Sequence, residues 1–108
     1  MAAIDGENYL NRVNCEHTHR IDALMQECGC SVKVVHQSER EDWIQNMVAG
    51  GLGICFLPEF SAVVPGVQTR PVIEPELWRE ICLVWRRGDT LTSSVQRFAK
   101  AARAYSWA

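Results

Sequence analysis

Apolar residues recur along the chain with two different spacings, one typical of helices and one typical of buried strands. Ile21, Leu24, Met25 and Cys28 follow one another at the three- and four-residue steps of a helix face. This stripe predicts a helix over Thr18–Glu27, and Gly29 provides its stop. Short β-branched or apolar runs on either side predict strands at residues 9–13 and 32–36.

The middle of the chain repeats this order of helix and strand. Ser38 followed three residues later by Glu41 has the form of a capping box, which predicts that a second helix begins there and runs to about Ala49. Glycines then precede a continuous apolar run over residues 53–57. Such a run is typical of a parallel strand that is covered on both faces, so it predicts a third strand.

Two further elements are expected toward the carboxyl end. Residues 81–85 are strongly apolar and predict a fourth strand, and Ser93 with Gln96 predicts a capped helix over residues 93–106. The alternation of strand and helix with short loops indicates the α/β class, with a parallel-rich sheet and flanking helices. The apolar face of the last helix must be buried against something, and we expect a homo-oligomer. That face comprises Val95, Phe98, Ala99, Ala102 and Tyr105.

Composition narrows the function classes. The chain has 108 residues and a formal net charge of −2, so it lacks the basic surplus of a free-standing DNA-binding domain. No apolar run approaches the roughly 20 residues that span a bilayer, which argues against a membrane partner. The first residues, Met-Ala-Ala-Ile-Asp-Gly, do not form a signal peptide, and a cytoplasmic location is expected.

The five cysteines raise three possible chemistries. Their odd number and the apolar surroundings of Cys55 and Cys82 favour reduced thiols. Cys15, His17, His19, Cys28 and Cys30 lie close in sequence, but their spacings do not match zinc sites, so no metal or other cofactor is predicted. No catalytic signature accompanies any cysteine, and we expect that the chain is not an enzyme. Cys15 could instead act as a redox sensor at a helix start.

Polar loops follow the first two predicted strands. In a parallel sheet these loops meet at the carboxyl edge, where ligands bind and where helix N-termini favour anions. A third loop, residues 58–61, leaves the sheet at the same edge. A small carboxylate is therefore the expected ligand, although Thr18 and Ser38 could simply cap their helices. The predicted ligand-binding residues are Asn14, Cys15, His17, Thr18, Gln37 and Ser38.

The segment Val48–Pro58, V-A-G-G-L-G-I-C-F-L-P, resembles the effector-binding domain of LysR-type transcriptional regulators. The likeness begins at Asp5-Gly6 and extends through residues 9–16, 38–43, 66–71 and 79–84 to the terminal helix. It implies one subdomain of a type II periplasmic-binding-protein-like fold. Residues 7–73 would form the second α/β subdomain, and residues 74–108 a crossover strand and the C-terminal helix. The resemblance places cleft-facing loops at residues 14–18 and 36–38.

The family resemblance also implies a function. The resemblance implies a small organic acid as co-inducer, and contact with DNA only through a helix-turn-helix that this chain lacks. Two alternatives stay open: a small-molecule-binding module unrelated to transcription, and a cysteine-based redox sensor. Peroxide-sensing members of the family carry a reactive cysteine soon after a similar Asp-Gly. Here Glu7, Asn8 and Tyr9 occupy those places, which counts against that route.

Overall fold

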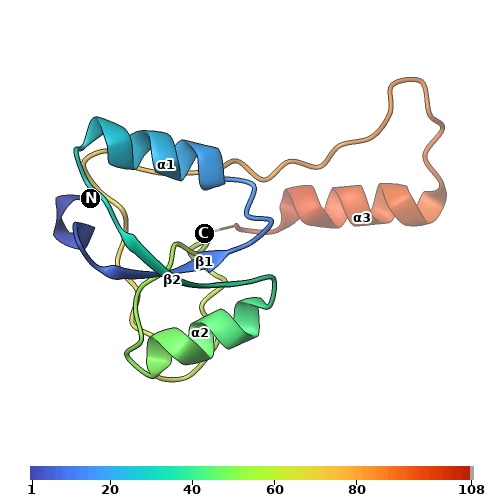
Figure 1. The fold of residues 1–108 in the computed structure, drawn as a ribbon. Coiled ribbons are helices and arrows are strands. Elements are labelled where there is room, and N and C mark those ends of the chain that lie inside the picture. The colour runs from blue at the N-terminus through green and yellow to red at the C-terminus, as the bar shows by residue number, and fades with distance from the viewer. Residues whose placement is uncertain (108) are drawn as a thin grey trace. The chain divides into compact units, whose positions relative to one another are not determined.

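The computed structural model describes residues 1–107, which divide into a first unit, Met1–Leu77, and a second that begins at Trp78 (Figure 1). The first unit contains a 3-10 helix η1 (Ala2–Ile4), strands β1 (Asn8–Arg12) and β2 (Lys33–Ser38), and helices α1 (Thr18–Glu27) and α2 (Glu41–Ala49). The second contains α3 (Ser93–Ala104).

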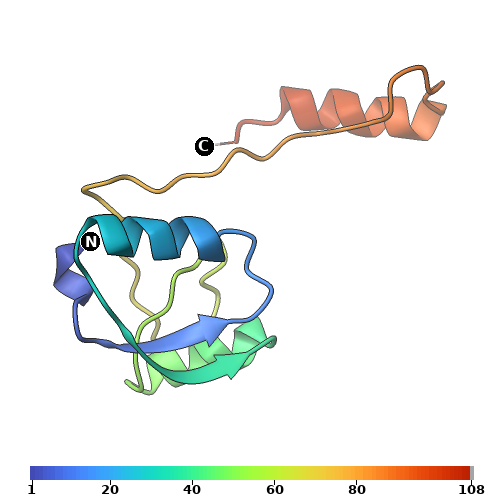
Figure 2. The same ribbon diagram turned by 45° about the horizontal axis from the view of Figure 1, so that its top comes forward.

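Strands β1 and β2 form a parallel two-stranded sheet. Their pairing runs from Asn8 opposite Lys33 to Arg12 opposite Ser38, with an irregularity between Tyr9 and Leu10. Helix α1 connects the strands on one side of the sheet, and α2 lies on the other side (Figures 1 and 2). A parallel sheet with helices on both faces is typical of α/β proteins, so the predicted α/β class is confirmed.

The core of the first unit lies on both faces of β1. Successive residues of a strand point to opposite faces, so Tyr9 and Leu10 are buried on different sides. Ile44 of α2 is fully buried, and Ile21 and Met25 are the buried residues of α1. The stripe predicted for α1 is thus confirmed at Ile21 and Met25, whereas Leu24 is half-buried and Cys28 is exposed. The helix ends as expected, with Gly29 in the left-handed region at φ 66°.

The predicted third strand is reduced to a single bridge. Ile54 pairs with β1 through Leu10 N donating to Ile54 O and Ile54 N donating to Asn8 O, both at 2.9 Å. A Cβ on Gly53 would lie only 2.5 Å from Asn8 O, so glycine is required for this close approach. Beyond Ile54, the Phe56 carbonyl accepts from the side chain of Arg12, and no strand is assigned over residues 55–57.

The second unit departs from the prediction of a strand at residues 81–85. That segment has no regular secondary structure, and Ile81, Leu83 and Val84 are exposed. A strand needs a neighbour for its backbone groups, and the second unit has no other strand among its described residues. In α3 only Ala99 of the predicted apolar face is buried. Phe98 and Tyr105 are 63% and 64% exposed.

Two predicted N-cap residues, Ser38 and Ser93, are wrong. Helix α2 begins at Glu41 with Arg40 at the N-cap position, because Ser38 still pairs with β1 as the last residue of β2. Helix α3 is capped by Thr92, whose hydroxyl oxygen accepts from Val95 N, so Ser93 is already the first helical residue. Among residues 1–107, no helix is both long enough and apolar enough to cross a membrane.

Candidate functional site at the carboxyl edge of the sheet

The ends of β1 and β2 lie side by side. Arg12 is the register partner of Ser38, and the Val13 amide just beyond β1 donates to Ser38 O at 3.0 Å. The structure therefore brings the loop after β1 next to the end of β2. This edge is where a parallel sheet presents its ligand-binding loops.

The loop after β1 is folded tightly before α1. Asn14 lies in the left-handed region at φ 66°, which asparagine tolerates better than most residues. The Thr18 hydroxyl donates to Cys15 O at 3.0 Å, closing the loop on itself. His17 occupies the N-cap position, but its side chain makes no capping hydrogen bond. Thr18 therefore secures the loop and does not cap α1.

Gln37 and Ser38 belong to β2 and not to a loop. The predicted strand ended at His36, whereas pairing with Asn11 and Arg12 extends β2 through Ser38. The Ser38 hydroxyl oxygen accepts from Arg40 N at 3.0 Å and so shapes the turn into α2. His36 also lies inside β2, which corrects the loop position that the family resemblance implied.

Sequence reasoning missed the most connected side chain at this edge, that of Arg12. Its Nη2 donates to Glu41 Oε2 at 2.8 Å, and its Nη1 donates to Phe56 O at 3.1 Å. Nη1 also approaches Cys15 Sγ at 3.9 Å. The guanidinium therefore joins β1, the start of α2, the segment after Ile54 and the loop before α1.

A signal for Arg12 was present in the sequence. It stands at the carboxyl end of a predicted strand, two residues after the buried Leu10, so both side chains project from the same face. In the structure α2 covers this face, so the Arg12 side chain is largely buried and paired with Glu41. Glu41 also fits the capping-box pattern with Ser38, and that pattern does not indicate an ion pair with Arg12.

The third loop is held by Gln45 of α2. This side chain is only 2% exposed. Its Nε2 donates to Ser61 O at 2.7 Å, and its Oε1 accepts from Val63 N at 2.9 Å and Val64 N at 3.1 Å. All three contacts are to backbone groups, and together they fix residues 61–64 against α2. The helical pattern alone did not indicate this role, because Gln45 lies beside the apolar stripe.

Burial raises the pKa of two side chains in this unit, those of Tyr9 and Cys55. Desolvation raises the pKa of Tyr9 to about 12, with a smaller contribution from the neighbouring Cys55. Desolvation likewise raises the pKa of the Cys55 thiol to about 11, and the charge of Arg12 opposes this only in part. The Tyr9 ring packs against Phe56 with centroids 5.9 Å apart.

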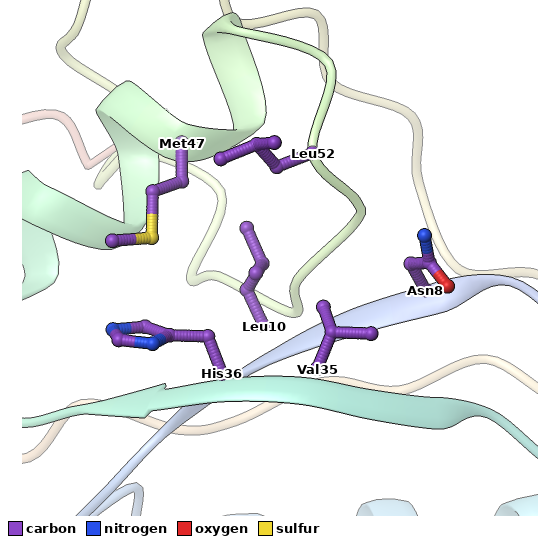
Figure 3. A pocket seen from close by; sticks show the side chains of 6 residues that line it. All are labelled: Asn8, Leu10, Val35, His36, Met47 and Leu52. Carbon is purple, nitrogen blue, oxygen red and sulfur yellow. The ribbon is translucent and has the colours of Figure 1, made fainter.

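A cavity of about 350 Å³ lies elsewhere, on the face of the sheet that α2 covers. Figure 3 shows Leu10 projecting from β1 toward Met47 and Leu52, with Val35 and His36 on β2. None of the six predicted ligand-binding residues lines this cavity. The cavity is therefore a gap between sheet and helix that is separate from the carboxyl edge.

The cysteines and histidines do not form a metal site in the described part of the chain. Among residues 1–107, no three His, Cys, Asp or Glu side chains are grouped so that they could hold an ion. All five cysteines are free thiols, with Cys28 and Cys82 exposed and the other three half-buried. The side chains at the carboxyl edge are a guanidinium paired with a carboxylate, amides, hydroxyls, an imidazole and the thiol of Cys15.

Comparison with known proteins identifies the family of the chain. The chain matches the family described as "LysR substrate binding domain" over residues 1–107. It is 39% identical over 83 residues to the "DNA-binding transcriptional dual regulator OxyR" of Escherichia coli K12, a match that covers 72% of this chain and 27% of that protein. It is 36% identical over 69 residues to the "Hydrogen peroxide-inducible genes activator" of Haemophilus influenzae, covering 60% of this chain and 23% of that protein.

A third relative is more distant. The "Uncharacterized HTH-type transcriptional regulator YwbI" of Bacillus subtilis is 26% identical over 90 residues, covering 78% of this chain and 30% of that protein. The chain thus spans about a quarter of the length of these curated relatives. No solved structure matches it. The match over residues 1–107 shows that the chain belongs to the LysR substrate-binding domain family, the effector-binding region of LysR-type regulators.

Proposed function

We propose that this chain binds a small organic acid at the carboxyl edge of its sheet, as the sensing part of a LysR-type transcriptional regulator. The supporting observation is the hydrogen bond between Val13 N and Ser38 O, which sets the polar loop after β1 beside the polar end of β2. Binding would involve the predicted residues at this edge: Asn14, Cys15, His17, Thr18, Gln37 and Ser38.

The two helix N-termini at this edge differ in how well they suit an anion. Helix α2 has Glu41 and Asp42 in its first turn, so acidic side chains already complement its dipole. Helix α1 has no acidic residue in its first turn and no side-chain cap from His17. The N-terminus of α1 therefore favours an external carboxylate, which points to the Asn14–Thr18 loop as the main contact.

The family membership extends the proposal to the whole protein. We propose that residues 7–73 correspond to one subdomain of a type II periplasmic-binding-protein-like fold, and residues 74–108 to a crossover strand and C-terminal helix. DNA would be bound by another region of the regulator, because a net charge of −2 gives this chain little affinity for phosphate. The edge would bind its ligand without catalysing a reaction.

Titration with benzoate, with the neutral benzamide as the matched control, tests ligand binding. Amide NMR spectra of the whole chain should shift with benzoate at the two loops of the carboxyl edge and should not shift with benzamide. The reason is that only benzoate carries the charge that a helix N-terminus favours. Equal shifts with both compounds, or shifts confined to the cavity around Leu10 and Met47, would contradict the proposal.

A second function, redox sensing, is favoured by one observation. The half-buried Cys15 has its Sγ 3.9 Å from Nη1 of Arg12, in the loop between β1 and α1. Two relatives are named as a regulator called OxyR and a hydrogen peroxide-inducible activator. Thiol counting after treatment with equimolar hydrogen peroxide separates the two functions, because only the redox function requires selective loss of the Cys15 thiol.

A further inference from the structure

We propose that Arg12 is the residue that binds the carboxylate of the acid, and that Glu41 takes the place of that carboxylate while the site is empty. This inference rests on the proposed function, since it names the cation of the same site. In the structure, Nη2 of Arg12 donates to Glu41 Oε2 at 2.8 Å.

The position of Arg12 suits it to receive a ligand anion. Its side chain is only 15% exposed, so a carboxylate beside it would be weakly screened by water. The hydrogen bond from Nη1 of Arg12 to Phe56 O fixes the position of the guanidinium. The same nitrogen is 3.9 Å from Cys15 Sγ. Ser38 is the register partner of Arg12 across the sheet. A carboxylate on Arg12 would therefore lie between the loop after β1 and the end of β2.

Glu41 is bound in a way that allows exchange. It is 38% exposed and is joined to Arg12 by one hydrogen bond, whereas a free carboxylate can offer both oxygens to the guanidinium fork. Once displaced, Glu41 would still lie in the first turn of α2, where the helix dipole favours a negative charge. Both effects lower the cost of replacing one carboxylate by another.

Exchange would also carry a signal. The Arg12–Glu41 pair connects the end of β1 to the start of α2, so a ligand that takes Arg12 breaks that connection. Internal competition also weakens the apparent affinity, because only molecules with a free Arg12 can bind. Removing the competing charge should therefore tighten binding, which distinguishes this arrangement from a simple structural ion pair.

The test measures the dissociation constant of benzoate by NMR titration for Glu41→Gln, Asp42→Asn and Arg12→Gln. Glu41→Gln should tighten binding roughly three- to tenfold, if Arg12 is otherwise paired most of the time. Asp42→Asn is the matched control, since it removes the same charge from the same helix turn but from a residue that pairs with Arg40. It should leave the constant nearly unchanged. Arg12→Gln should weaken binding at least tenfold.

Each other result overturns a specific statement. If wild type binds benzoate and Arg12→Gln binds it equally well, this inference is wrong and the proposed function stands. Equal tightening by Glu41→Gln and Asp42→Asn would also refute it, because general charge would explain both. Absence of benzoate binding in every variant would refute the proposed function together with this inference. If Arg12→Gln does not fold, judged by circular dichroism, the comparison of Glu41→Gln with Asp42→Asn decides alone.

Discussion

Tyr9 and Cys55 show how burial of single side chains makes the fold sensitive to alkaline pH. Both groups are neutral when protonated, and both have a raised pKa in the folded chain, about 12 for Tyr9 and about 11 for Cys55. The folded state therefore holds these protons at pH values where the unfolded chain has lost them. Their contribution to stability is complete below about pH 9 and is lost as the pH rises through 11 and 12.

This leads to a prediction for urea unfolding between pH 8 and pH 11. The free energy of unfolding should fall as the pH rises, and Tyr9→Phe should reduce the fall because phenylalanine has no proton to lose. A shift from 10 to about 12 corresponds to roughly 2–3 kcal/mol for Tyr9 when the titration is complete. If Tyr9→Phe loses stability as steeply as wild type, burial of the tyrosine hydroxyl is not the cause.

At the scale of the element, helix α3 offers a direct comparison of two neighbouring hydroxyls. The Thr92 hydroxyl oxygen accepts from Val95 N, whereas Ser93 is the first residue of the helix. Thr92→Ala should therefore destabilise α3 by about 1 kcal/mol, and Ser93→Ala should have a much smaller effect. Circular dichroism at 222 nm during thermal unfolding measures both variants. A larger loss for Ser93→Ala would show that the sequence-based cap, and not Thr92, begins the helix.

Elements with a strong local pattern could be predicted from the sequence. Helix α1 has the predicted bounds, Thr18–Glu27, because its stripe and its glycine stop agree. The strands at residues 81–85 and 53–57 failed for a non-local reason. An apolar run becomes a strand only where a neighbour can pair with it, and β1 pairs with Ile54 alone in that segment. The apolar pattern does not contain this information.

The location of the candidate site could be predicted from the sequence, but the partners of Arg12 could not. The order of strand and helix was sufficient to place the loops after β1 and β2 at one edge. The partner of Arg12 is 29 residues away in the sequence, and the carbonyl it contacts is 44 residues away. Pairing over such distances depends on the sheet register, which a single sequence does not define.

At the scale of the whole molecule, helix α3 has apolar side chains that are not buried. Phe98 and Tyr105 are more than half exposed, and Trp107 folds back so that its Nε1 donates to Ala102 O at 2.7 Å. Phe98, Ala101, Ala102, Tyr105 and Trp107 line a shallow apolar hollow of about 220 Å³. Burying one large apolar side chain stabilises by about 1.5–3 kcal/mol, so association through this surface is favoured.

We therefore predict that the chain forms a homodimer or larger oligomer through α3. Light scattering at high micromolar concentration should give at least twice the monomer mass, and Phe98→Asp should restore the monomer by placing a charge in the apolar hollow. Lys100→Asp, an exposed change on the same helix, is the control and should leave the mass unchanged. A monomeric wild type, or equal masses for wild type and Phe98→Asp, would contradict the prediction.

The amide of Gln45 has a consequence for how this domain can vary among relatives. It binds residues 61–64 only through their backbone groups, at Ser61 O, Val63 N and Val64 N. Such a connection does not depend on which side chains the loop carries, provided that no proline removes an amide that donates. It does depend on the number of residues between the donor and the acceptors. Side chains in this loop can therefore diversify freely, whereas a single inserted or deleted residue would separate the loop from α2.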